Sequence, residues 1–88
     1  EDAIIKLNDR EYMVLGATNL DDVSDALNID LTSDDYDTIG GYCLELLDHL
    51  PQKNEIMFTE DGILLKIQEV DKNRIERIYI KLPEKTEK

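Results

Sequence analysis

The chain has 88 residues, of which 41% are hydrophobic and 35% charged, and its formal net charge is −11 at pH 7. This length allows one domain with a single core and excludes a two-domain enzyme with a cleft between its domains. The negative charge argues against nucleic-acid binding, and every apolar run is shorter than the ~18 residues of a membrane-spanning helix, so direct membrane insertion is not expected.

Two β-type runs open the chain, at residues 3–7 and 11–15, with turn-forming residues 8–10 between them. This pattern predicts a β-hairpin. Asn19 then precedes apolar residues at helical spacing, which predicts a helix over residues 20–28 with Asn19 as its cap.

The negative charge is concentrated in residues 11–52, which contain ten acidic residues and no Lys or Arg. Within this block, residues 29–37 are dense in Asp, Ser and Thr, which predicts an ordered loop. Such a surface disfavours nucleic acids and anionic membranes as partners. Three roles remain open for this surface: it binds a cation, it contacts a basic protein partner, or it is a solvated face that only keeps the domain soluble. The ten residues are Glu11, Asp21, Asp22, Asp25, Asp30, Asp34, Asp35, Asp37, Glu45 and Asp48.

An apolar stripe at helical spacing predicts a second helix over residues 38–50, capped by Asp37 or Thr38 and stopped by Pro51. The stripe consists of Ile39, Tyr42, Cys43, Leu46, Leu47 and Leu50. We expect it to pack on a sheet, with Cys43 as a small core residue rather than a reactive thiol. A single cysteine excludes an internal disulfide and is typical of a reducing compartment.

Gly40 and Gly41 occupy the first turn of this second helix, where each glycine costs about 1 kcal/mol relative to alanine. Either a neighbouring backbone packs closely there, or the exposed amides bind an anion. We favour close packing, because the phosphate-binding glycine spacings are absent and Asp34, Asp35 and Asp37 would repel a phosphate.

Three more β-type runs follow, at residues 55–59, 63–70 and 74–82, with Gly62 and Asn73 in the connecting turns. Together with the hairpin they predict an α+β domain in which two helices pack on a mainly antiparallel sheet. The pattern does not determine the strand order.

Alternation along the last two β-type runs separates an apolar core face from a polar, partly basic face. The polar face contains Lys66, Arg77, Tyr79 and Lys81. We expect residues 1–83 to form the domain and residues 84–88 to be a charged, frayed tail. The chain starts without Met or a signal-peptide pattern, so we expect a piece of a larger protein.

Candidate catalytic or metal-binding residues are few. His49, the one histidine, stands at the predicted helix end, and its spacing to other groups predicts no catalytic triad. Asp35 and Asp37 resemble the start of an EF-hand loop, but Ile39 and Leu46 occupy positions where oxygen ligands belong. The sequence therefore predicts a protein that is not an enzyme, with no cofactor site and no dedicated metal site.

The segment Asp-Tyr-Asp-Thr-Ile-Gly-Gly, residues 35–41, precedes an apolar helix and a Leu-Pro pair, and this arrangement resembles the CorC/HlyC transporter-associated domain. The likeness covers residues 3–82. It departs from the family at residues 48–49, where a Gly is usual, and at Asn54, where the family has Gly in a Gly-Glu pair. Asn adopts a left-handed backbone almost as readily as Gly, so we expect the turn to survive.

This resemblance implies a regulatory cytosolic module, on the cytoplasmic side of the plasma membrane, in magnesium or cobalt efflux proteins or haemolysin-like proteins. Its partners would be the CBS and membrane domains of the same protein. The fold of the family resembles part of FAD-binding (PCMH-like) domains, which does not by itself imply a flavin site. The alternatives are a module that binds flavin or nucleotide, and a direct metal sensor.

Two surfaces are candidate partner contacts, and their opposite charges could also hold two copies in a weak homodimer. The first is the acidic loop with Asp34, Asp35, Tyr36 and Asp37. The second is the polar sheet face with Lys66, Arg77, Tyr79 and Lys81. Three further residues have structural roles in the predicted motif, namely Gly40, Gly41 and Pro51.

Overall fold

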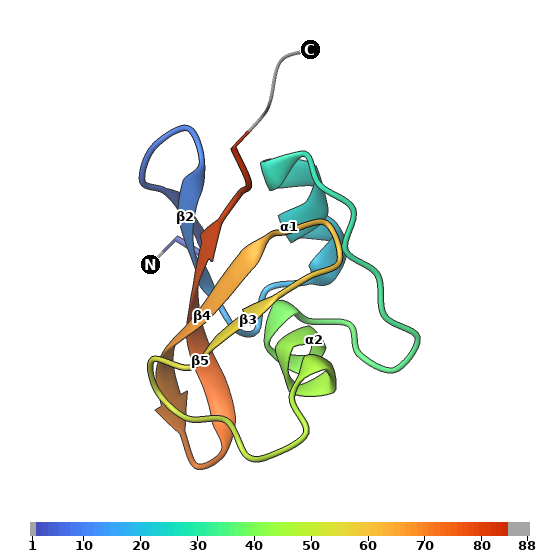
Figure 1. The fold of residues 1–88 in the computed structure, drawn as a ribbon, viewed down its shortest axis with the longest axis vertical. Helices are drawn as coiled ribbons and strands as arrows, with labels where there is room; N and C mark the ends of the chain where they lie inside the picture. Colours follow the sequence, from blue (N-terminus) through green and yellow to red (C-terminus); the bar gives the residue numbers. More distant parts are fainter. Residues whose placement is uncertain (1, 85–88) are drawn as a thin grey trace.

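In the computed structural model, which describes residues 2–84, two helices cover one face of a five-stranded sheet (Figure 1). The elements are β1 (Ile4–Lys6), β2 (Glu11–Leu15), α1 (Leu20–Leu27), α2 (Ile39–Leu46), β3 (Ile56–Phe58), β4 (Leu64–Asp71) and β5 (Arg74–Lys81). The strand order is β1-β2-β5-β4-β3, and every neighbouring pair is antiparallel. The predicted α+β architecture is confirmed. Of the predicted tail, only Glu84 lies within the described residues.

Helix α1 begins where its cap Asn19 predicted it and ends at Leu27, one residue before the predicted end. The side chain of Asn19 accepts a hydrogen bond from the backbone N–H of Asp21 at 2.8 Å. Asn28 ends the helix in a left-handed conformation, with φ 57° and ψ 47°, and its N–H donates to the carbonyl of Ser24. Since Asn tolerates this conformation better than most residues, both ends of α1 are determined by local sequence. Val23 is completely buried on the face towards the sheet.

Helix α2 ends at Leu46, so the prediction of a helix to residue 50 is wrong. Leu47 is already extended, with ψ 145°. Pro51 disfavours a helical conformation at Leu50, and Pro51 itself is buried while Leu50 is 64% exposed. The chain after α2 therefore buries its proline instead of completing another helical turn.

The early end of α2 also corrects the predicted buried stripe. Ile39 and Cys43 are completely buried, whereas Leu46 is 39% exposed. Tyr42 and Leu47 are partly buried against the core. The apolar period thus identified the buried face at the start of the helix but extended it too far along the chain.

The turns of the sheet use residues that tolerate positive φ. Lys72 and Asn73 join β4 to β5 with φ of 53° and 67°, as a tight two-residue hairpin connection requires. Asn54 has φ 73°, which confirms the expectation that it replaces a glycine in a left-handed turn. The β4–β5 register shifts on both sides of Glu69, so a bulge interrupts the strict alternation near the end of β4.

The core lies between the sheet and the helices. Alternating residues of the central strands, Val14, Leu65, Ile67, Ile78 and Ile80, are 0% exposed. The core is completed by Tyr12, Leu20, Val23, Leu27, Leu31, Ile39, Cys43, Met57, Ile63 and Ile75. The predicted core face of the last two β-type runs is therefore confirmed.

Candidate functional site

The first turn of α2 packs against the loop after β2. A Cβ atom built on Gly40 would lie 2.9 Å from the carbonyl oxygen of Gly16 and 3.2 Å from that of Ile75. One built on Gly41 would meet the ring of Tyr36. The two glycines are thus required for close packing, and the preferred interpretation of this motif is confirmed.

The backbone amides of the same turn already have acceptors within the protein. The N–H of Ile39 donates to Thr18 and that of Gly40 to Gly16, both at 2.9 Å. The N–H of Gly41 donates to the hydroxyl of its own cap, Thr38, at 3.1 Å. Because these amides are all used internally, they are not available to bind a phosphate or another anion.

The acidic loop between the helices is ordered by its own side chains. The hydroxyl of Ser33 accepts hydrogen bonds from the N–H groups of Asp35 and Tyr36 and donates to Glu45 of α2. The carbonyl of Asp37 accepts a hydrogen bond from Leu20 at 2.7 Å, which ties the end of the loop to the start of α1. The predicted ordered loop is therefore present.

The four candidate contact residues of this loop are exposed: Asp34, Asp35, Tyr36 and Asp37. Their carboxylates do not converge: within residues 2–84, no three or more His, Cys, Asp or Glu side chains are grouped closely enough to hold a metal ion. A shallow hollow of about 250 Å³ lies beside them, lined in part by Tyr36, Asp37 and Thr32. This geometry presents negative charge to solvent on a fixed backbone.

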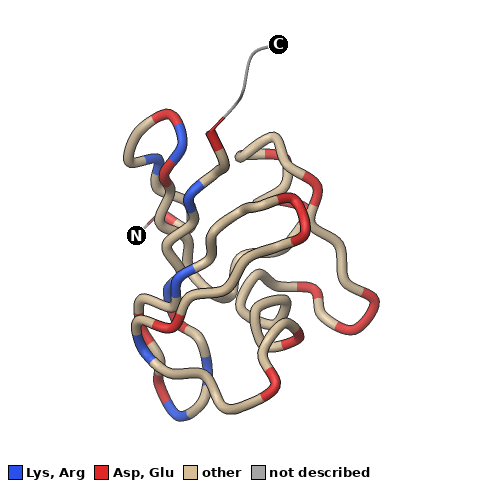
Figure 2. The backbone as a smooth tube through the Cα atoms, in the orientation of Figure 1, with Lys and Arg blue, Asp and Glu red and all other residues tan. Residues whose placement is uncertain are grey.

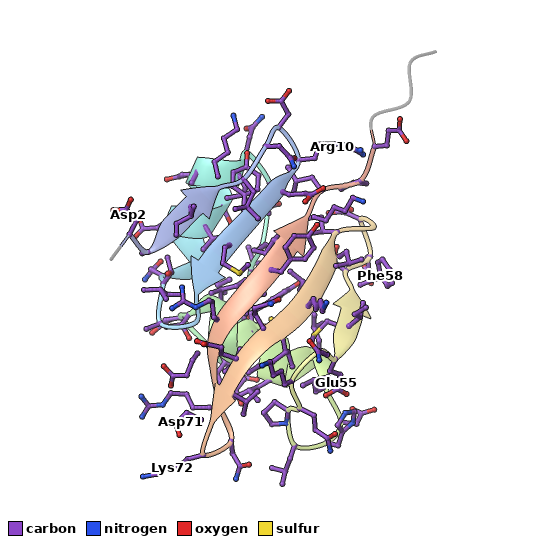
Figure 3. All side chains as sticks on the ribbon, turned by 90° about the vertical axis from the view of Figure 1, so that its left-hand side faces the viewer. Asp2, Arg10, Glu55, Phe58, Asp71 and Lys72 are labelled. Atoms are coloured by element: carbon purple, nitrogen blue, oxygen red, sulfur yellow. The ribbon has the colours of Figure 1, made fainter. Side chains whose placement is uncertain are left out.

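The other candidate residues lie together on the sheet face turned away from the helices, which we call the outer face and which Figure 3 views directly. Lys66 and Tyr79 are cross-strand partners in the centre of the sheet. Arg77 forms an ion pair with Glu69 at 3.2 Å. Lys81 stands opposite Glu11 in the register of β5 and β2. The expectation that these four residues share one face is confirmed.

Tyr79 is also held by a polar contact on the outer face. Its pKa is raised above the ordinary value, first by partial desolvation and then by a hydrogen bond to the carboxylate of Glu11 together with the negative charge of that group. Glu11 lies diagonally across the β2–β5 ladder from Tyr79, because Met13 is the direct partner. The tyrosine therefore stays neutral at physiological pH and serves as a hydrogen-bond donor.

The outer face is less polar than predicted. Its central strands carry the polar candidates, but apolar side chains occupy the outward positions on the flanking strands and at one end of β4. These apolar residues are Ile5, Met13, Leu15, Ile56, Phe58 and Leu64. Ile56 and Phe58 are 51% and 62% exposed. The sequence showed these residues, but only the strand pairing shows that they share a face with Lys66.

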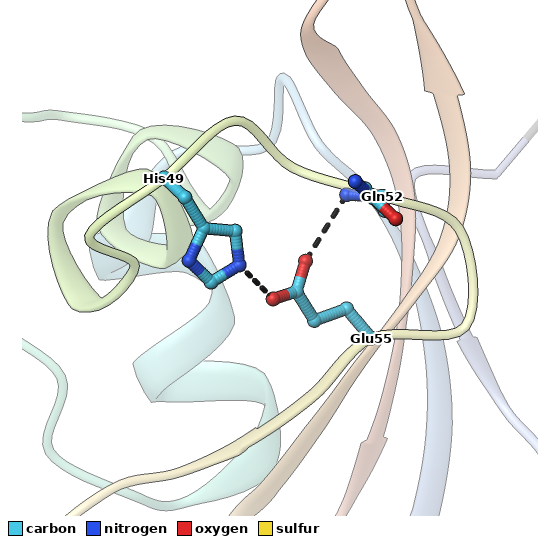
Figure 4. A network of polar contacts seen from close by, with 3 residues as sticks. All are labelled: His49, Gln52 and Glu55. Carbon is cyan, nitrogen blue, oxygen red and sulfur yellow. Dashed lines mark hydrogen bonds and ion pairs between the residues drawn. The ribbon is translucent and has the colours of Figure 1, made fainter.

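His49 and Glu55 stabilise the loop between α2 and β3 (Figure 4). The imidazole Nε2 of His49 contacts one carboxylate oxygen of Glu55, and the other accepts a hydrogen bond from the N–H of Gln52 at 3.1 Å. His49 lies in this loop rather than at a helix end, because α2 has already ended. Its contact with Glu55 joins two residues of this loop, so His49 has a structural role there.

Cys43 is a core residue. It is 0% exposed, and burial raises the pKa of its thiol to about 12 from an ordinary value of 9.0. At physiological pH the thiolate, which is the nucleophilic form, is therefore suppressed. The predicted core role of Cys43 is confirmed.

The charges of the described residues are segregated (Figure 2). Lys and Arg lie over the sheet and its adjoining turns, while the helices and the loop between them carry only Asp and Glu. Neither described helix is both long enough and apolar enough to cross a membrane. The helix side thus carries acidic charges alone, while the sheet side carries Lys and Arg together with acidic residues such as Glu11, Glu69 and Asp71.

Solved structures with the same fold include domains described as transporter associated. A transporter associated domain from Nitrosomonas europaea is 25% identical with a TM-score of 0.84, covering 94% of this chain and 99% of that one. The transporter associated domain of a CBS domain protein from Porphyromonas gingivalis is 28% identical with a TM-score of 0.80, covering 94% and 100%. These similarities define a class of small domains associated with transporters.

This chain belongs to the CorC_HlyC family of transporter associated domains, whose model matches residues 5–84. It is 27% identical over 79 residues to the magnesium and cobalt efflux protein CorC of Escherichia coli K12, covering 90% of this chain and 27% of that protein. It is also 29% identical over 83 residues to a polyamine export protein of Salmonella typhimurium, covering 91% and 18%. The chain thus spans about a quarter of the length of the CorC relative.

Proposed function

We propose that this domain is a non-catalytic regulatory module of a membrane protein that exports cations, of the magnesium and cobalt efflux or haemolysin-like type. The observation that carries the proposal is the match to efflux proteins over 90% of this chain but only 27% of the relative. Such a share is that of an accessory part, with transport performed elsewhere. The module would lie on the cytoplasmic side of the plasma membrane, beside CBS and membrane domains.

The transported cargo belongs to one chemical class. One set of relatives is named for magnesium and cobalt and another for polyamines, and both cargoes are cations. We infer a cation as the cargo of the parent protein, without choosing between metal and polyamine. We expect the acidic loop not to be a dedicated site for it, because within residues 2–84 no three or more His, Cys, Asp or Glu side chains are grouped closely enough to hold a metal ion.

The module would act through its two charged surfaces. A regulatory domain changes transport only if its contacts differ in free energy between transporter states. The acidic loop at residues 34–37 leads directly into α2, and the outer face around Lys66 belongs to the five-stranded sheet. They are the surfaces through which such a difference would arise.

The alternative of a flavin or nucleotide module has less support. In the glycine-rich turn of α2, the backbone amides donate hydrogen bonds to Thr18, Gly16 and Thr38. No other glycine-rich helix start exists within residues 2–84. Phosphate binding would therefore need a site of a different kind.

Deletion of residues 3–82 from the parent protein tests the proposal. Efflux of magnesium, cobalt and a polyamine would be measured in vesicles at matched expression, with a flexible linker in place of the domain. We expect at least one efflux rate, or its regulation, to change while the membrane part remains assembled. Unchanged rates, regulation and assembly would contradict the proposal.

A further inference from the structure

The outer face of the sheet has an unusual composition for a solvated surface. An antiparallel sheet with one face in water normally shows apolar residues inward and polar residues outward. Strand β2 instead presents Met13 and Leu15 outward, and β3 presents Ile56 and Phe58. Exposed apolar patches of this kind mark interaction sites more often than plain surface.

The strand pairings place the apolar residues on both sides of a basic centre. One row across the sheet runs through Ile5, Met13, Tyr79, Lys66 and Ile56, one residue from each strand in the order β1-β2-β5-β4-β3. At a strand spacing of about 4.8 Å, this row spans roughly 19 Å. A helix of about 13 residues has that length, so one amphipathic helix covers the row.

The cations at the centre of the outer face are not all neutralised within the domain. Arg77 is paired with Glu69. Within residues 2–84, neither Lys66 nor Lys81 has a carboxylate within 4.0 Å of its ammonium group. A partner that supplies carboxylates beside apolar side chains therefore complements this face in both charge and polarity.

A second copy of the outer face complements it less well than an acidic helix. A second copy would bring further cations, and its two carboxylates on this face are already engaged, Glu69 by Arg77 and Glu11 by Tyr79. An anionic membrane is also a poor fit. The domain carries a net charge of −11, and the opposing potential of the acidic side weakens attraction to a lipid surface.

We propose that the outer face docks an amphipathic, acidic helix of the parent protein, whose apolar stripe lies on Met13, Tyr79 and Ile56 and whose Asp or Glu residues reach Lys66 and Lys81. This inference rests on the proposed function, because it names the contact through which the module acts. Docking adds a third layer to the fold, with the sheet between the new helix and the pair α1 and α2.

Photo-crosslinking in the full-length parent tests this docking. A benzoylphenylalanine in place of Ile56 reports on the outer face, and one in place of Asp25, an exposed residue of α1, is the matched control on the acidic side. Crosslinked peptides would be sequenced by mass spectrometry. We expect a crosslink from position 56 to one segment with an apolar helical stripe bordered by Asp or Glu, at least fivefold above the control.

Charge reversal separates docking from chance proximity. Lys66→Glu should lower the crosslink yield several-fold, whereas Lys72→Glu, at the exposed β4–β5 turn, should leave it unchanged. A crosslink to lipid, to a second copy or to a basic segment would overturn the inference, as would a yield no higher than the control. Deletion of the domain reports on the proposed function separately, so altered efflux without the crosslink would reject only the docking surface.

Discussion

The two faces of the sheet differ in what covers them. The inner face is closed by α1 and α2, and its central residues, such as Ile78, are 0% exposed. The outer face carries a smaller set of apolar residues around its polar centre, and two of them, Ile56 and Phe58, are more than half exposed. The inner face therefore accounts for the stability of the domain, and the outer face is available for its contacts.

The largest expected effect is the loss of unfolding free energy when a side chain of the inner face is shortened, compared with one of the outer face. Ile78→Ala should lower the free energy of unfolding by about 2–5 kcal/mol, because it removes a fully buried side chain and leaves a cavity. Ile56→Ala, on the outer face, should cost less than about 1 kcal/mol. Urea unfolding of both variants provides the measurement, and equal losses would contradict the assignment of the faces.

A smaller effect is expected at the glycine-rich turn that places α2 on the inner face. Gly40→Ala should destabilise by about 1–3 kcal/mol, because the added Cβ meets backbone oxygens of Gly16 and Ile75 that cannot move independently. Gly41→Ala should destabilise the domain as well, because its Cβ would lie 2.5 to 2.8 Å from Cδ1, Cβ and Cγ of Tyr36, so the tyrosine must move away. Thermal unfolding of both variants measures the losses, and unchanged midpoints in both would reject the packing explanation.

The inner face should also show a pH dependence through Cys43. Its pKa is raised from 9.0 to about 12 by burial, so the folded state holds the thiol proton over a pH range where the unfolded state releases it. Stability from this group is complete below pH 9 and is lost as the pH rises towards 12, with a slope of up to about 1.4 kcal/mol per pH unit. Cys43→Ala should remove this slope in alkaline urea titrations; an identical slope in both proteins would be evidence against the buried thiol.

The smallest effect concerns the charges that distinguish the two sides. In the isolated domain, where no helix of the parent protein covers the outer face, the acidic loop and the cations of that face carry opposite signs. We therefore expect two isolated copies to associate weakly, and this association should disappear as salt is added. Sedimentation at low and high ionic strength measures it. Lys66→Glu should weaken association without changing the unfolding midpoint, and a dimer that persists in high salt would require a different interface.

The sequence allowed more of the inner face to be predicted than of the outer face. Alternation in β4 and β5 identified Leu65 and Ile80 as core, and Asn19 predicted the start of α1, because these signals are local. The end of α2 was missed, since the apolar period continues through Leu47 and Leu50 after the backbone has left the helix. Apolar spacing reports which side of a helix is buried, not where the helix stops.

The full set of residues on the outer face could not be predicted from the sequence, for a different reason. Met13 and Ile56 lie on β2 and β3, which are separated in the sheet by β5 and β4. Their place in one row with Lys66 depends on long-range pairing that no local pattern determines. The four polar candidates were found because their two strands follow each other in the chain and form a hairpin.

The most direct test of the account is cation efflux by the parent protein with a charge-reversed outer face. The double variant Lys66→Glu and Lys81→Glu would be compared with the domain deletion and with a control, Lys72→Glu and Arg74→Glu, at the exposed β4–β5 hairpin end. We predict that the outer-face variant changes efflux in the same direction as the deletion, while the control behaves as wild type. Normal efflux in the outer-face variant, together with altered efflux in the deletion, would contradict the claim that the module acts through this face.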